Sequence, residues 1–182
     1  GWDHKSLIIG VRDMGKWAFY RLPIASHSYD GAHGWNTEWP RIRDVGTPVK
    51  PDYLMTMHGM FWHFPGSFTS GNAQGIRPRS AYLKVIPDFA RWNNQLIFGA
   101  DDESNAEFIN GRKIKGNIEG FTQSNSNIWF TSLEKPDQLG PNTAGGAVWL
   151  SEQIKADEVS EPILFAGWNS RSAWIKNEGK QP

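Results

Sequence analysis

Short runs of apolar residues, rather than helical periods, dominate the pattern of this chain. Residues 7–11 and 17–22 are apolar, β-branched or aromatic runs on either side of an Asp/Gly turn, which predicts a β-hairpin. Residues 82–92 and 95–100 flank an Asn-Asn pair, and asparagine tolerates the positive φ of a two-residue turn. Pro87 within the first arm predicts an edge position or a bulge. Similar runs predict further strands at residues 53–64, 128–133, 147–150, 163–166 and 173–175.

Many short strands without helices predict an all-β fold, either a β-propeller or a β-sandwich. An internal repeat favours the propeller. Aromatic-rich runs at 17–22 and 149–154 each lead through a loop to an acidic/proline pair and an apolar run, at 51–55 and 161–165. This order is typical of the outer strand of one blade leading to the inner strand of the next.

A chain of this length holds about two such blades, fewer than the ~4–8 of a closed ring. We therefore expect residues 1–182 to be a single all-β domain or a fragment of a larger β-propeller. The remainder of a longer chain, or additional copies of this one, would then complete the fold.

Tryptophan is the most informative residue type, with ten copies spread over the 182 residues. Indole either fills a core or offers a flat platform to a ligand such as the apolar face of a sugar. Those that fall in predicted strands are expected in the core or between blades: Trp17, Trp92, Trp129, Trp149 and Trp174. Those with polar neighbours are expected to bind a ligand: Trp35, Trp39, Trp62 and Trp168.

The bulk composition narrows the classes of function. Nineteen basic residues balance nineteen acidic ones, which gives no support for binding nucleic acid or an anionic membrane. No apolar run approaches the ~20 residues of a membrane span. The absence of cysteine excludes disulfides, cysteine zinc sites and thiol catalysis. We expect no cofactor, with a structural calcium ion near the acidic run at 101–103 as the alternative.

Four segments resemble a family of uncharacterised exported bacterial proteins associated with β-propeller carbohydrate-active enzymes. They are Ser28 to Arg41, Met55 to Trp62, Ile76 to Ser80 and Ser160 to Pro162. The first hairpin also carries Asp13-x-Gly15-x-Trp17, which resembles part of the Asp-box turn of sialidase-like propellers, without its serine and threonine. The resemblance implies a glycan substrate and a periplasmic or extracellular location. It does not transfer catalytic residues, because such propellers include both glycosidases and polysaccharide lyases.

All five histidines lie in the first 63 residues. If residues 53–64 form one strand, alternation places His58 on the same face as Thr56, Met60 and Trp62. We expect this strand to line the central channel, with His58 as a catalytic residue and Trp62 as a sugar platform. The alternative is a half-buried strand histidine held by a backbone carbonyl.

Residues 33–41 bring together an imidazole, a carboxylate, a guanidinium and two indoles, from His33, Trp35, Glu38, Trp39 and Arg41. Glu38 is a candidate general acid, because neighbouring indoles that exclude water would raise its pKa. His33 is a candidate base. The structural alternative is that the two indoles fix a long loop to the sheet while Glu38 pairs with Arg41.

Three further positions are candidates. Asp101 ends a predicted strand, where it can serve as a catalytic carboxylate or begin a solvated acidic loop. Arg77 and Arg79 flank a proline and point to the same side, so their guanidinium groups suit a uronate carboxylate, or they only solvate the surface. Asn125 lies in a polar run that binds sugar hydroxyls or forms a turn.

These residues predict a carbohydrate-active protein that cleaves glycosidic bonds, with a carboxyl of Glu38 or Asp101 as the acid of a glycoside hydrolase. One alternative is a polysaccharide lyase, in which His58 or His33 takes the proton beside a uronate carboxylate held by Arg77 or Arg79. Another is a non-catalytic module that binds glycans or serves as a structural segment of a propeller.

Overall fold

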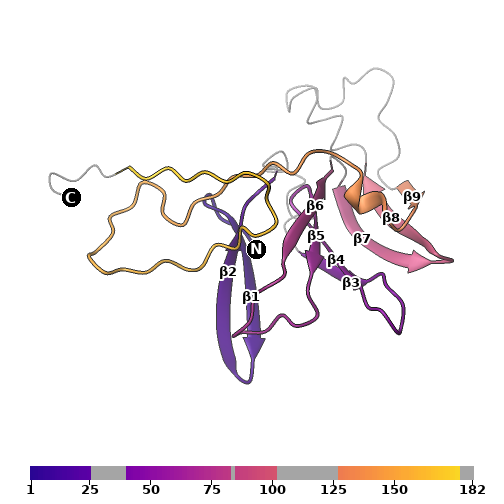
Figure 1. Cartoon of the computed structure of the whole chain (residues 1–182), viewed down its shortest axis with the longest axis horizontal. Helices are drawn as coiled ribbons and strands as arrows, with labels where there is room; N and C mark the ends of the chain where they lie inside the picture. Colours follow the sequence, from indigo (N-terminus) through magenta and orange to yellow (C-terminus); the bar gives the residue numbers. More distant parts are fainter. Residues whose placement is uncertain (26–39, 83–84, 102–126, 177–182) are drawn as a thin grey trace, which may run out of the picture.

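The computed structural model describes residues 1–25, 40–82, 85–101 and 127–176. In these ranges, nine strands form three antiparallel sheets, and the helical element is the short 3-10 helix η2 (Lys135–Asp137). The predicted all-β fold is confirmed. The three sheets lie next to one another along the molecule (Figure 1).

Within each sheet, strands that are consecutive in the sequence are neighbours. The first sheet is β1 (Leu7–Asp13) and β2 (Lys16–Leu22). The second is β3 (Arg41–Asp44), β4 (Tyr53–Met57), β5 (Met60–Phe64) and β6 (Arg77–Ala81). The third is β7 (Val85–Trp92), β8 (Gln95–Asp101) and β9 (Asn127–Thr131).

Tight turns join the strands of three hairpins in the described part of the chain. Both central residues of each turn have positive φ, which matches the twist of the flanking strands. The pairs are Met14-Gly15, His58-Gly59 and Asn93-Asn94. The hairpins predicted at 7–22 and 82–100 are therefore confirmed, and the register of β7 shifts between Val85 and Asp88, around Pro87.

The single strand expected at residues 53–64 is wrong. His58 and Gly59 have φ of 46° and 75° and turn the chain back, so that Met57 pairs with Met60 and Thr56 with Phe61. Two short strands therefore replace one long strand, and His58 lies in the turn between them.

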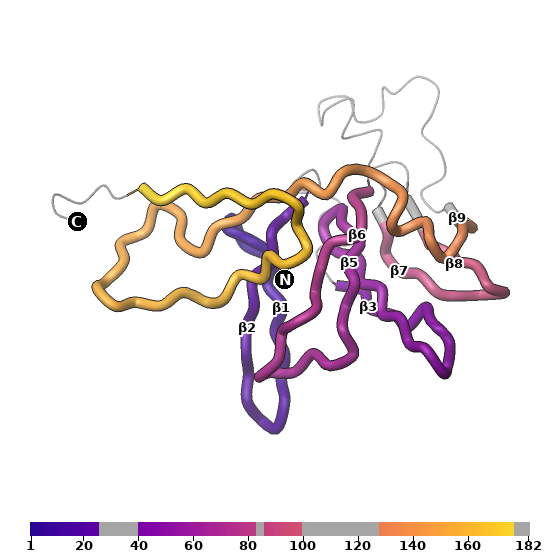
Figure 2. Tube along the Cα trace, viewed as in Figure 1, coloured from indigo at the N-terminus to yellow at the C-terminus, as the bar shows by residue number. Residues whose placement is uncertain are grey.

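The strands expected at 147–150, 163–166 and 173–175 are also wrong, because the structure describes residues 141–176 and finds no strand there. The backbone of this segment pairs with β2 at one isolated bridge, between Arg21 and Ile163. The N–H of Arg21 donates to Pro162 O and the N–H of Leu164 donates to Arg21 O, at 2.8 and 2.7 Å. A bridge this short satisfies too few backbone groups to make a strand. Figure 2 shows the segment looping away from β2.

The middle sheet is buried on both faces. Alternate residues of β4 and β5, including Met55, Met57 and Trp62, pack against Leu7 and Leu22 of the first sheet. The residues between them contact the third sheet, where Leu54 and Phe61 pack with Phe89, Leu96 and Phe98. Aromatic rings dominate this second contact, with centroids of Phe61 and Phe98 5.4 Å apart. Sequential sheets are thus stacked face to face.

A buried arginine of β2 binds the N-terminal segment and residue 161. Arg21 Nη1 donates to the Asp3 carboxylate and to Ser6 Oγ, and its Nε donates to Glu161 Oε2 at 2.6 Å. Burial alone would raise the pKa of Asp3, but hydrogen bonds from Arg21 and two backbone N–H groups outweigh it and lower that pKa. Glu161 is 140 positions from Arg21, so the sequence pattern contains no local sign of this pair.

Candidate functional site

Several strand ends meet at one end of the stacked sheets, which we call the loop end. Arg41 begins β3 and pairs with Thr56, beside the His58-Gly59 turn. Val85 begins β7 and pairs with Asp101, the last residue of β8. The chain therefore leaves β8 for residues 102–126, and enters β3 from residues 26–39, at this same end (Figure 1).

His58 is the best-defined candidate at the loop end. The residue is 1% exposed, and its ring makes an edge contact with Trp2, with centroids 5.4 Å apart. Its φ of 46° lies in the left-handed region, which is uncommon for residues other than glycine and is found most often there for Asn, Asp and His. The turn and the contact with Trp2 fix the position of the imidazole at the loop end.

Arg41 lies next to this turn and joins two sheets. Its Nε donates to the carbonyl of Pro87 at 2.6 Å, which links β3 of the second sheet to β7 of the third. Thr56, its partner in register, has a hydroxyl oxygen that is buried without a hydrogen-bond partner among the described residues. An unsatisfied buried hydroxyl beside a cation can accept or donate a hydrogen bond to a polar ligand or a water molecule.

Other predicted residues of the site fall outside the described ranges. These are His33, Trp35, Glu38, Trp39 and Asn125. Asp101 is described only as the backbone position that ends β8 at the loop end. Residues 26–39, which include four of the candidates, connect β2 to Arg41, and Asn125 precedes the first residue of β9.

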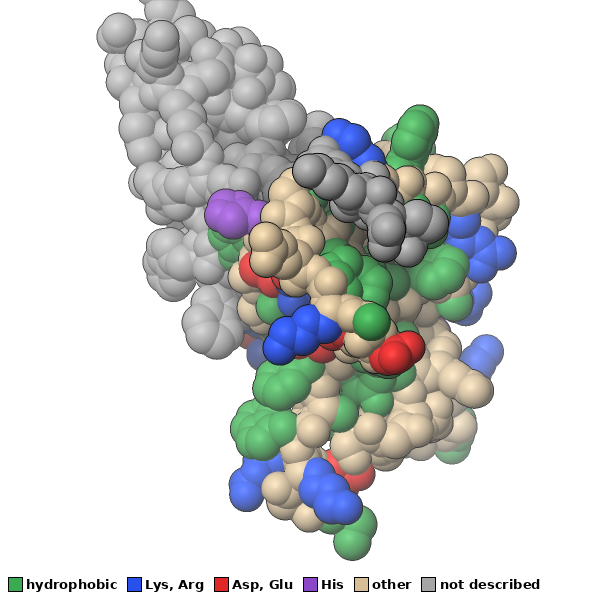
Figure 3. Space-filling model, turned by 90° about the vertical axis from the view of Figure 1, so that its left-hand side faces the viewer, with side chains coloured by type: hydrophobic (Ala, Val, Ile, Leu, Met, Phe, Trp, Pro, Cys, Tyr) green, Lys and Arg blue, Asp and Glu red, His purple; other side chains and the backbone are tan. Residues whose placement is uncertain are grey.

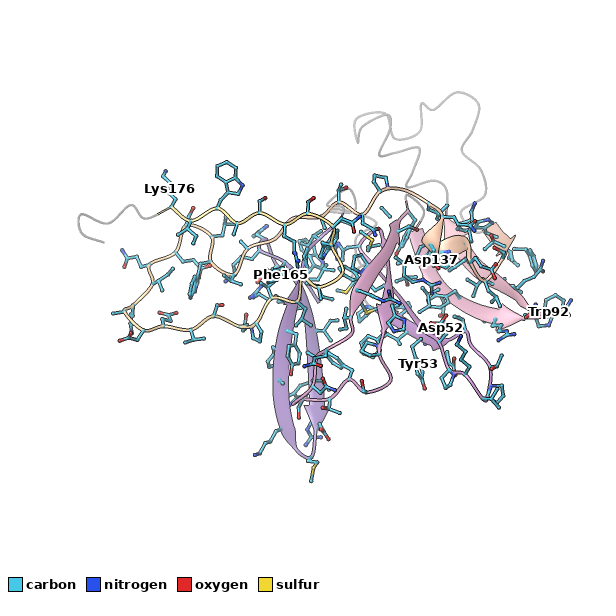
Figure 4. The ribbon with its side chains drawn as sticks, in the orientation of Figure 1. Asp52, Tyr53, Trp92, Asp137, Phe165 and Lys176 are labelled. Carbon is cyan, nitrogen blue, oxygen red and sulfur yellow. The ribbon has the colours of Figure 1, made fainter. Side chains whose placement is uncertain are left out.

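Arg77 begins β6 and Arg79 lies at its centre, whereas Ala81 ends the strand at the loop end. Arg77 pairs with His63, at the far end of β5 from the His58 turn. Arg79 donates to both carboxylate oxygens of Asp137 at 2.8 and 2.7 Å, and its Nη1 is 3.7 Å from Asp52 Oδ2. These hydrogen bonds lower the pKa of Asp137. Figure 4 labels Asp52 and Asp137 next to the second sheet. The expectation that Arg79 is available for a uronate carboxylate is therefore wrong, because Asp137 already occupies it.

Two tryptophans expected to bind sugar are packed instead. Trp62 is 1% exposed in the contact between the first two sheets. Trp168 packs edge-on against it, with ring centroids 6.1 Å apart. Both indole N–H groups are buried without a hydrogen bond in the described part of the chain. The assignment of Trp62 as a sugar platform fails because the His58-Gly59 turn sets it on the inner face of β5.

The opposite error concerns tryptophans expected in the core. Trp17 is 61% exposed and Trp92 60%, and Trp174 is almost fully exposed. Trp17 alternates with Leu22 and Tyr20, which face the second sheet, so it points to the other face of β2. Trp92 ends β7 at the tip of its hairpin (Figure 4). Trp129, by contrast, packs on Phe98 as expected.

Within the described ranges, His, Asp and Glu do not gather in groups of three or more that could hold a metal ion. The described residues also contain no helix long and apolar enough to cross a membrane. No family model matches the sequence, and it matches neither a curated protein nor a solved structure.

Proposed function

We propose that this chain belongs to a β-propeller that binds a glycan at the loop end and hydrolyses its glycosidic bonds. The observation that carries the proposal is the position of Arg41, His58 and the end of β8 at one end of adjacent sheets. The residues that enter β3 at that end include Glu38 and two tryptophans. Loops at one end of a rigid sheet scaffold are where such folds present binding groups.

The stacking of the sheets supports the propeller. Each sheet contacts its neighbour face to face, and the middle one is buried on both faces. The last strand of one sheet leads to the first strand of the next, as β2 does to β3 and β6 to β7. Arg41 and Arg43 of β3 bond to Pro87 and Asp88 of β7, so the first strands of the two sheets are neighbours. Neighbouring first strands are what a propeller, whose inner strands surround one axis, would have.

In the proposed reaction, a carboxyl of Glu38 or Asp101 protonates the leaving oxygen of the glycosidic bond, and the other assists attack by water or forms the covalent intermediate. Arg41 binds a sugar hydroxyl beside them, and the buried ring of His58, packed on Trp2, positions the turn next to Arg41. The lyase alternative is weakened, because Asp137 already binds Arg79 and Arg77 lies at the opposite end of the second sheet from the His58 turn. The hydrolase is therefore favoured.

The test is a panel of neutral and acidic polysaccharides, measured for new reducing ends and for the ultraviolet absorbance of an unsaturated product. Hydrolysis gives reducing ends without absorbance, and the Glu38→Gln and Asp101→Asn variants should each lose at least about 100-fold in rate. Absorbance that rises with the reducing ends would show a lyase. Glycan binding without cleavage would show a non-catalytic glycan-binding module. The absence of both glycan binding and cleavage would overturn the proposal.

A further inference from the structure

Each of the two outermost sheet faces of the described stack exposes a cluster of apolar side chains. The outer face of the β1–β2 hairpin, which we call the hairpin face, exposes Trp17 and Phe19 with nearly parallel rings, 8° between planes and 5.9 Å between centroids. Both rings lie over Gly10, whose missing side chain keeps this face flat. Figure 3 looks onto this side of the molecule and shows exposed hydrophobic side chains with Lys and Arg next to them.

The outer face of the third sheet, which we call the terminal face, has the same character. Trp92, Ile128 and Phe130 are 60, 64 and 52% exposed. Ile97 pairs with Phe130 and Gly99 with Ile128, so one face of β8 and β9 presents these residues together. Monomeric proteins seldom leave such patches in water unless the patch binds something.

The two faces belong to the first and the last sheet of the stack, with the second sheet between them (Figure 1). These two faces therefore cannot pack against each other within one copy. Within the chain, every inner sheet face is covered by the aromatic and aliphatic face of the next sheet. The same packing continues if the hairpin face of one copy meets the terminal face of another.

Charge favours this head-to-tail contact over a contact between two identical faces. Arg12 pairs with Trp17 in register, so two hairpin faces in contact would bring two arginines together. Among the described side chains of the terminal face, the charged residue is Asp88, and Arg43 already binds it at 2.8 Å. The terminal face therefore accepts Arg12 without repulsion.

We propose that copies of this chain associate head to tail, with the hairpin face of one stacked on the terminal face of the next. A contact of this kind closes into a ring when the rotation between copies allows it. The association does not depend on the proposed glycan site, because the loop end takes no part in it.

The test is the mass in solution, by light scattering and sedimentation, of the wild type and of Trp17→Ser and Trp92→Ser over a wide range of concentration. We expect the wild-type mass to rise above one chain, and each variant to associate at least about tenfold more weakly. A mixture of the two variants keeps one intact face of each kind, so it should form a dimer and nothing larger. Val49→Ser, which changes an exposed residue on neither face, should behave as the wild type.

Three results would overturn the proposal. The wild type could stay a single chain at every concentration, one variant could associate as well as the wild type, or the mixture could fail to form a dimer. Near-ultraviolet circular dichroism checks that each variant folds, with Phe19→Ser and Phe130→Ser as replacements if it does not. Loss of glycan binding in Trp17→Ser without a change in mass would show that the hairpin face is a saccharide platform instead.

Discussion

The indole of Trp62 is the largest fully buried side chain in the described part of the chain. It fills the contact between the first two sheets together with Met55, Met60 and Leu22. Close packing of this kind gives a large cost to any cavity, whatever the chemistry of the residue. We therefore treat Trp62 as part of the scaffold that positions the loop end.

The first prediction follows from this burial. Trp62→Ala should lower the free energy of unfolding by about 3–5 kcal/mol, measured by urea titration, because the cavity cannot be refilled. Trp174→Ala, at an exposed position, should stay within about 0.5 kcal/mol of the wild type. A Trp62→Ala protein that is equally stable but binds glycans more weakly would restore the role of sugar platform.

Hairpins are the elements that the sequence predicts best here. The Asp/Gly turn before Trp17 and the Asn93-Asn94 pair specify their hairpins locally, so β1, β2, β7 and β8 follow from residues close in sequence. Strand β3 does not, because its four residues depend on pairing with β4 rather than on their own pattern. The apolar runs near Trp149 and Ile163 do not form strands for a related reason. A strand needs a partner strand, and Ile163 pairs with β2 at a single bridge, to Arg21.

The sequence predicts only part of the candidate site, because the rest depends on contacts between residues that are distant in the chain. His58 and Arg41 are identified by residue type, but the turn at Gly59 decides that they share one end of the sheet while Arg77 lies at the other. A histidine in a left-handed turn gives almost no sequence signal, since Asn or Gly is the usual residue there. Arg79 and Asp137 are 58 positions apart, so their pairing cannot be predicted from the sequence around either residue.

The second prediction concerns the turn between β4 and β5. Gly59→Ala should lower the free energy of unfolding by about 1 kcal/mol or more, because φ of 75° strains a residue with a side chain. Gly71→Ala is the matched control, since an added methyl group meets nothing within 4 Å there and should change stability by less than about 0.5 kcal/mol. Equal stabilities for both variants would contradict the turn conformation.

At the scale of the whole molecule, two arginines bind carboxylates of distant segments. Arg21 holds Asp3 and Glu161, and Arg79 holds Asp137. The pKa values of Asp3 and Asp137 are both lowered in the folded chain. A carboxyl with a lowered folded pKa contributes stability that is present above its unfolded pKa, about 3.9, and is lost as pH falls through its folded pKa.

The third prediction is therefore that the folded protein loses stability at acid pH. The stability of the wild type should be nearly constant from neutral pH to about pH 5 and should fall below about pH 4. The double variant Asp3→Asn/Asp137→Asn should lose about 1 kcal/mol at neutral pH and show a shallower acid slope, in urea titrations at several pH values. The loss is modest because both carboxylates are partly exposed and solvent screens them. Parallel acid slopes for the two proteins would refute this.

The central claim, a glycan site at the loop end, is tested most directly by two matched histidine variants. His58→Asn removes the imidazole but supplies the residue that the turn prefers, whereas His63→Asn makes the same change at the other end of β5. With the polysaccharide that the wild type binds best, measured by calorimetric titration, the account predicts at least about tenfold weaker binding for His58→Asn and no change for His63→Asn. Equal affinities for the two variants, or a loss confined to His63→Asn, would contradict it.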